Sequence, residues 1–73
     1  MNIQEILAEN LKRYRRERGI SQEELAHLAE IDRTYISSVE RRQYAASIEV
    51  VDRLARALGI EASDLLSTND KEA

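Results

Sequence analysis

Residues 20–40 read ISQEELAHLAEIDRTYISSVE, and this stretch predicts two short helices, each preceded by its own capping residue. Ser21 precedes Glu24 by three residues, so its hydroxyl can accept a hydrogen bond from the Glu24 N–H while the Glu24 carboxylate accepts one from the Ser21 N–H. Asp32 repeats this signal, because its carboxylate can accept from the first N–H groups of a helix and its negative charge suits the positive helix end. We therefore expect a helix after Ser21, a tight turn, and a second helix that begins at Arg33.

Two short helices joined by a tight turn are the arrangement of a helix-turn-helix, whose second helix contacts base edges in the major groove of DNA. Arg33 can donate both arms of its guanidinium group to guanine O6 and N7, which Lys cannot do, but a salt bridge to Asp32 or Glu30 is the structural alternative. Tyr35 can reach a phosphate or a base, or it can cover the edge of the domain. The predicted base-contacting residues are Arg33, Thr34, Tyr35, Ser37 and Ser38.

Amphipathic patterns predict three further helices. Residues 3 to about 18 carry one apolar stripe and end at Gly19, which accepts the left-handed conformation found at helix C-termini. Ser47 caps a fourth helix that Gly59 ends in the same way, and a short fifth helix covers roughly residues 62–66. We expect a compact all-α, five-helix domain over residues 1–66 and a polar, disordered tail over residues 67–73. The expected buried faces contain Ile3, Ile6, Leu7, Leu11 and Tyr14; Leu25, Leu28 and Ala29; Ile36 and Val39; and Ile48, Val51, Leu54, Ala55 and Leu58.

Composition narrows the classes of function. The chain contains no Cys, and a single His27 cannot form a zinc site alone, so we expect no metal, no cofactor and no catalytic constellation. No apolar run is long enough for a signal core or a membrane span, which favours a cytoplasmic protein without a membrane partner. The net charge of −3 argues at first against DNA. However, basic side chains outnumber acidic ones by five to three in residues 1–20 and by four to two in residues 41–60, so a basic face can still form.

One set of residues spread along the chain matches a known pattern: Gln22, Leu25-Ala26, Ile31, Ile36-Ser37, Glu40 and Leu54-Ala55-x-Ala57-Leu58-Gly59. With this set, the chain resembles the lambda-repressor/Cro-like helix-turn-helix domains over about residues 6–66. The segment from Asp32 to Arg41 resembles the controller proteins of restriction–modification systems in particular, which are small dimeric regulators of transcription. The chain departs from the family pattern at Glu30 and Arg42, where glycine is usual, and a left-handed residue other than glycine costs about 1–2 kcal/mol.

The resemblance also implies roles outside the second motif helix. Gln22 matches a position whose amide contacts a DNA phosphate, although a solvated glutamine at a helix start is the simpler interpretation. The loop after the third helix would run along the DNA backbone, but cations there can also offset the helix dipole. Arg15 and Glu40 match a structural ion pair. The phosphate-contacting residues implied are Gln22, Arg41, Arg42, Gln43 and Tyr44.

Two arguments predict a homodimer. Ile60, Leu65 and Leu66 provide more apolar surface than so small a core encloses, and one short helix contacts too few base pairs for specificity. We therefore expect a transcriptional regulator that binds double-stranded DNA at a palindromic or pseudopalindromic operator, with these three residues at its two-fold interface. Activation would need contact with RNA polymerase, for which Glu23 and Glu24 are candidates. The competing hypothesis is a protein-interaction module of the same fold, such as an antitoxin, and an enzyme is the least favoured class.

Overall fold

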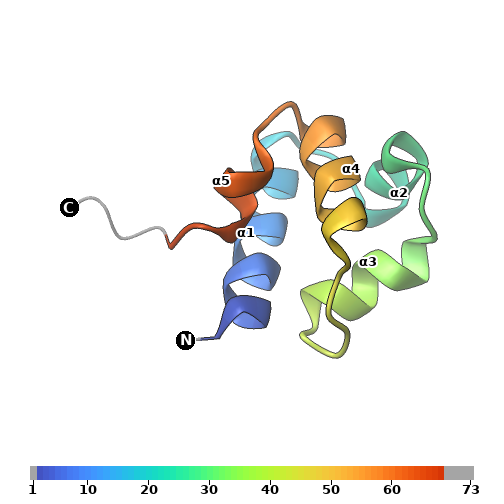
Figure 1. The fold of residues 1–73 in the computed structure, drawn as a ribbon. Helices are drawn as coiled ribbons and strands as arrows, with labels where there is room; N and C mark the ends of the chain where they lie inside the picture. The colour runs from blue at the N-terminus through green and yellow to red at the C-terminus, as the bar shows by residue number, and fades with distance from the viewer. Residues whose placement is uncertain (1, 69–73) are drawn as a thin grey trace.

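The computed structural model describes residues 2–68, which form five helices and no strand (Figure 1). The predicted all-α, five-helix fold is confirmed. No helix in this part of the chain is long and apolar enough to cross a membrane. Of the tail predicted at residues 67–73, residues 69–73 lie outside the described residues. The helices are α1 (Ile3–Glu17), α2 (Gln22–Ala29), α3 (Arg33–Glu40), α4 (Ile48–Leu58) and α5 (Ala62–Leu66).

Side-chain caps fix where the two motif helices begin. The Ser21 Oγ accepts from the Glu24 N–H at 3.0 Å, and the Asp32 Oδ1 accepts from the Thr34 N–H at 2.8 Å. These bonds satisfy N–H groups that have no partner within their own helix, so α2 and α3 begin directly after the capping residues. The reciprocal capping-box bond predicted at α2 is not formed within residues 2–68, and the start of α1 has a complete capping box.

Left-handed residues follow the C-terminal ends of α1, α2, α3 and α4. Gly19 and Gly59 follow α1 and α4 with φ values of 68° and 72°, a conformation that glycine adopts without a Cβ clash. Glu30 ends α2 with φ 60°, and Arg42 lies in the loop after α3 with φ 62°. Both positions at which the chain lacks the family's glycine are therefore left-handed, so that the turn between α2 and α3 stores backbone strain.

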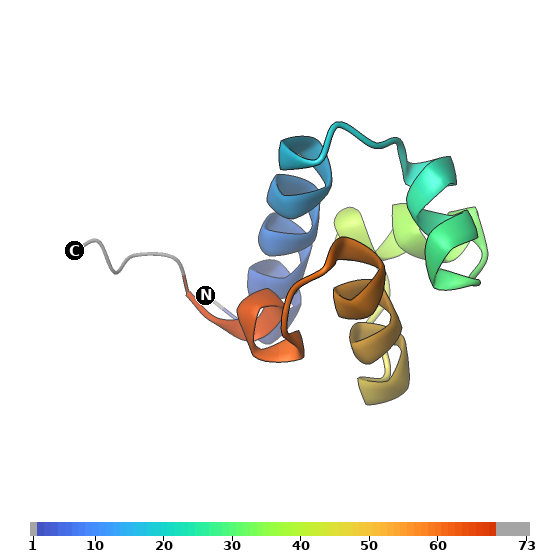
Figure 2. The same cartoon turned by 90° about the horizontal axis from the view of Figure 1, so that it is seen from above.

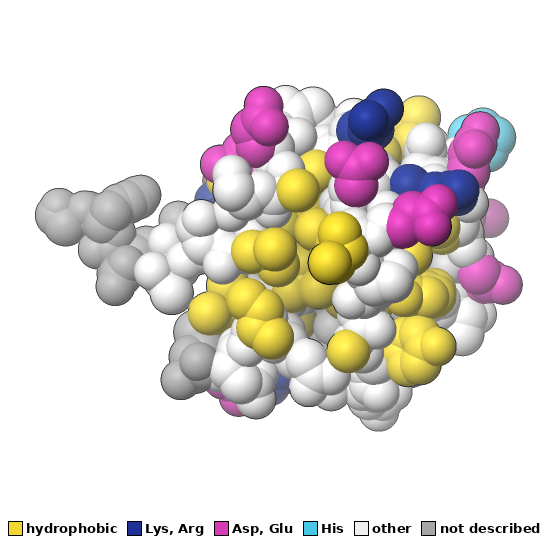
Figure 3. All heavy atoms as spheres, viewed as in Figure 1, with side chains coloured by type: hydrophobic (Ala, Val, Ile, Leu, Met, Phe, Trp, Pro, Cys, Tyr) yellow, Lys and Arg dark blue, Asp and Glu magenta, His cyan; other side chains and the backbone are white. Residues whose placement is uncertain are grey.

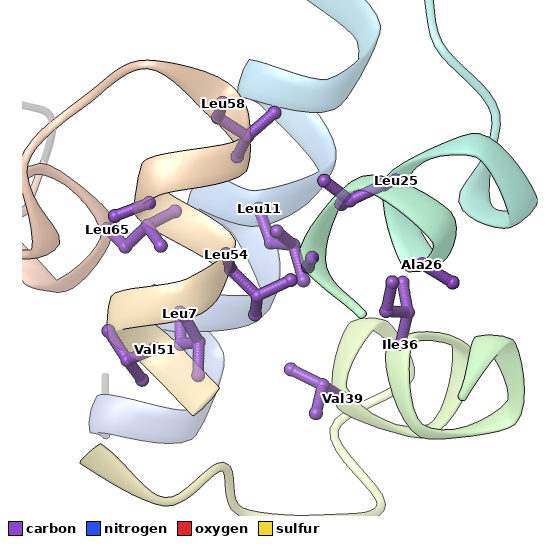
Figure 4. Close-up of a cluster of buried hydrophobic side chains, with 12 residues drawn as sticks. Leu7, Leu11, Leu25, Ala26, Ile36, Val39, Val51, Leu54, Leu58 and Leu65 are labelled. Atoms are coloured by element: carbon purple, nitrogen blue, oxygen red, sulfur yellow. The ribbon is translucent and has the colours of Figure 1, made fainter. Parts of the chain in front are cut away.

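One core joins all five helices (Figure 4). Leu11, Leu25, Ile36 and Leu54, from the first four helices, have no exposed surface. α1 lies beside α5 and α3, and α4 packs against α2 and α5 (Figures 1 and 2). Because α3 packs one face against α1 and α2, its opposite face is left toward solvent.

Three residues predicted on buried faces are exposed. Ile48 is 90% exposed and Ile3 is 55% exposed, because they are the first residues of α4 and α1 and lie beyond the end of the core. Leu28 is 52% exposed and lies at a shallow groove between α2 and α4. The apolar periodicity identified the correct side of each helix but not where the core stops.

The three residues predicted at the dimer interface differ in burial. Leu65 has no exposed surface, because it packs in the core. Ile60 is half-buried against the same core. Of the three predicted interface residues, Leu66 is the one that is exposed.

Candidate nucleic-acid interface

The solvent-facing side of α3 carries the predicted base-contacting residues. Arg33 and Thr34 are exposed in the first turn, and Ser37 and Ser38 are half-buried one turn later. A small hollow of about 140 Å³ is lined by Arg33, Thr34 and Ser37, so these three side chains share one surface. The outward face therefore offers one guanidinium group and several hydroxyl groups, which are the donor and acceptor types that read base edges.

Arg33 and Arg41, at the two ends of α3, form no ion pair within residues 2–68. The alternative interpretation of Arg33, a salt bridge to Asp32 or Glu30, is therefore not realised among these residues. By contrast, six other basic side chains have a carboxylate partner: Lys12, Arg13, Arg15, Arg42, Arg53 and Arg56. Arg33 and Arg41 thus keep their charge available for an external anion.

Tyr35 occupies the edge of the domain rather than the outward face of α3. Its ring packs edge-on against Tyr44 with 4.9 Å between the ring centroids and 83° between the ring planes. Its hydroxyl oxygen accepts from the Ser47 N–H at 3.4 Å, at the start of α4. Of the roles left open for Tyr35, this geometry favours the structural one, in which Tyr35 holds the loop between α3 and α4.

The predicted phosphate-contacting residues gather at the C-terminal end of α3. The Gln22 amide donates from Nε2 to the Oε1 of Glu40, the last residue of α3, at 2.9 Å. Arg41, Arg42, Gln43 and Tyr44 follow directly and are all exposed. Arg42 lies 3.6 Å from a carboxylate oxygen of Glu5. The predicted phosphate-contacting residues thus come from the start of α2 and from the loop after α3, and they lie at the C-terminal end of α3. Arg33 lies at its N-terminal end.

Sequence reasoning missed Asn10, which is 3% exposed in the middle of α1. Its Nδ2 donates to the backbone oxygens of Leu65 and Ser67 at 2.8 Å and of Asp64 at 3.3 Å. These bonds satisfy carbonyl groups at the end of α5 and fix α5 on α1. The available signal was a polar residue within the apolar stripe of α1. Within residues 2–68, no group of acidic and histidine side chains is placed to hold a metal ion.

Comparison with known proteins places the chain in a family. The model of the helix-turn-helix family matches residues 11–65. The chain is 43% identical over 67 residues to the control protein C.SmaI of Serratia marcescens, which covers 92% of this chain and 80% of that protein. It is also 40% identical over 65 residues to a hypothetical transcription factor of Neisseria meningitidis, covering 89% of this chain and 61% of that protein's length.

Solved structures agree with the sequence matches. The crystal structure of the Neisseria hypothetical transcription factor superimposes with a TM-score of 0.93 at 37% identity, covering 97% of this chain and 82% of that one. The restriction–modification controller protein C.Esp1396I, solved as a tetramer in complex with its natural 35-base-pair operator, gives a TM-score of 0.79 at 25% identity, covering 92% of this chain and 99% of that one. The chain belongs to the helix-turn-helix family of DNA-binding transcriptional regulators, the family of these restriction–modification control proteins.

Proposed function

We propose that the protein is a sequence-specific regulator that binds a palindromic or pseudopalindromic operator as a homodimer and controls the genes of a restriction–modification system. The similar proteins support this proposal, since one is a control protein and another is solved with its operator. The observation that carries it is that Arg33 and Arg41, at the ends of the solvent-facing helix α3, have no carboxylate partner within residues 2–68. Arginines without an internal carboxylate partner are suited to binding a polyanion.

In this proposal, base reading and phosphate contact are carried by different residues of α3 and its surroundings. Arg33, Thr34, Ser37 and Ser38 read base edges, with Arg33 on a guanine. Tyr35 supports the loop. Contacts to phosphate position the protein without reading sequence, and they come from the cluster at the C-terminal end of α3: Gln22, Arg41, Arg42, Gln43 and Tyr44.

We further propose that the dimer forms through an apolar face on α1, α4 and α5. Figure 3 shows hydrophobic side chains gathered in the middle of this face, with charged side chains along its upper and right edges. The hydrophobic side chains surround a groove of about 610 Å³. A two-fold axis through the groove would cover the exposed Ile48 with the same surface of a second copy. The carboxylate residues Glu49 and Asp52 also line the groove, and its apolar lining, which we propose as the interface, is Ile3, Leu7, Ala46, Ile48, Val51, Ala62 and Leu66.

The same apolar face could instead receive a different protein, as the antitoxin hypothesis requires. A second copy is favoured because one α3 helix reads only one half-site, whereas a dimer reads two. We assign no catalytic role to the protein and place it in the cytoplasm, where its DNA target would lie. Activation would use the exposed Glu23 and Glu24 of α2 to contact RNA polymerase.

The test is selection of bound sequences from a pool of random duplex DNA, followed by titration of the selected operator at several salt concentrations. The proposal predicts an enriched inverted repeat and an affinity whose logarithm falls linearly with the logarithm of salt concentration. Arg56→Ala provides a matched control, because Arg56 already pairs with Asp52 on α4 and lies outside the proposed interface with DNA. A pool without an enriched motif would show that the protein does not read sequence.

A further inference from the structure

A hollow of about 320 Å³ lies between α3 and the loop that follows it, beside the proposed base-reading face. The edge-on rings of Tyr35 and Tyr44 form one wall. The other residues that line the hollow are Asp32, Thr34 and Ser38, so a carboxylate and two hydroxyl-bearing side chains lie beside the two tyrosines. Thr34 and Ser38 already belong to the base-reading set, so a base edge that contacts them would also meet the Asp32 carboxylate.

The Asp32 carboxylate can accept more hydrogen bonds than the one that it accepts as the cap of α3. Its Oδ1 accepts from the Thr34 N–H, and the carboxylate has no other hydrogen-bond or ion-pair partner within residues 2–68. Ser or Asn would cap α3 about as well. A carboxylate at this place is repelled by DNA phosphates, so it weakens binding unless it accepts a hydrogen bond from the DNA.

We propose that Asp32 determines specificity by accepting a hydrogen bond from the N4 amino group of a cytosine in the major groove. This inference rests on the proposed function. An ionised carboxylate is an acceptor only. Guanine and thymine present acceptors in the major groove, and adenine presents its amino group beside the acceptor N7, whereas cytosine presents a donor alone. The carboxylate therefore favours cytosine and rejects guanine and thymine.

Selection from random duplex DNA with three proteins tests the inference: the natural chain, Asp32→Ser and Asp32→Asn. The natural chain should select a cytosine at one position of each half-site, with a preference of about 5- to 150-fold over the other bases. Asp32→Ser should lose this preference and keep the rest of the motif. Asp32→Asn should change it toward adenine, because an amide can pair with adenine N6 and N7 together.

Both substitutions preserve the cap of α3, so thermal unfolding should stay within a few degrees of the natural chain and confirm that the variants fold. An unchanged motif in Asp32→Ser, with tighter binding to every sequence, would overturn the inference and leave Asp32 as a cap that repels DNA. That result would leave the proposed function intact, because the natural chain would still have selected a motif. A natural chain that selects no motif would overturn both.

Discussion

Arg15 of α1 and Glu40 of α3 form a two-pronged ion pair, with 2.8 Å from Nε to Oε2 and 3.0 Å from Nη2 to Oε1. Both side chains are largely buried, with 13% and 3% of their surfaces exposed. A third bond reaches the same carboxylate from the Gln22 amide of α2. Glu40 therefore links α1 and α2 to α3, the helix that carries the proposed base-reading residues.

Removing one partner of this pair should be strongly destabilising. Arg15→Ala would leave the Glu40 carboxylate buried without its counter-charge, which costs about 3–5 kcal/mol in the free energy of unfolding. Urea denaturation followed by circular dichroism measures the loss. Arg56→Ala is the control, because the Arg56–Asp52 pair is exposed and should contribute less than about 1 kcal/mol. Equal losses in the two variants would mean that the buried pair has no special role.

The strained turn offers a substitution that should stabilise the protein. Glu30→Gly should raise the free energy of unfolding by up to about 1 kcal/mol, because glycine relieves the Cβ clash at φ 60° and loses part of that gain to unfolded-state entropy. Glu23→Gly, in the exposed first turn of α2, should instead lower it by about 0.5–1 kcal/mol. Calorimetry on both variants checks the difference in sign, and a lower melting temperature for Glu30→Gly would contradict the explanation.

Base reading and phosphate contact should separate in two arginine variants. Arg33→Ala should weaken operator binding by about 1–3 kcal/mol, relax the preference at one base pair, and affect random DNA less. Arg41→Ala should weaken both DNAs about equally and reduce the slope of affinity with salt by about one. Fluorescence anisotropy on operator and random duplexes distinguishes the two patterns. Equal losses on both DNAs for Arg33→Ala would remove Arg33 from the base-reading set.

The proposed dimer interface predicts different outcomes for two apolar residues. Ile48→Asp should give a folded monomer with much weaker operator binding, because Ile48 is exposed in the protomer and covered only in the dimer. Leu65→Asp should fail to fold, because it would bury an unpaired charge in the core. Sedimentation and circular dichroism measure assembly and folding separately. A dimeric Ile48→Asp variant would place the interface elsewhere.

Local signals predicted most of the fold. Each motif helix begins beside a side chain that can cap it, and two helices end at a glycine, so Asp32 and Gly59 were recognisable from their neighbours in sequence. The two left-handed positions occupied by Glu30 and Arg42 were also located correctly, through the family pattern.

The limits of the core could not be predicted in this way. Leu65 and Leu66 are equally apolar neighbours, and only the packing of α5 on α1 and α4 decides that Leu65 is buried and Leu66 exposed. Ile48 and Leu28 lie on the apolar side of their helices but are exposed, because helical periodicity indicates which side of a helix faces the core and not how far along the helix the core extends. The bonds of Asn10 to α5 span more than 50 residues of sequence, so no local pattern could reveal them.

Operator spacing tests the central claim most directly, namely that two copies of α3 read two half-sites. A two-fold dimer holds its copies of Arg33 about 34 Å apart, so half-sites should lie about 10 base pairs apart centre to centre. Affinity should be measured by anisotropy for the selected operator and for the same operator with five base pairs inserted at its centre. The insertion rotates one half-site to the opposite side of the duplex, and we predict that affinity falls to that of a single half-site. Unchanged affinity after the insertion would contradict reading by a symmetric dimer.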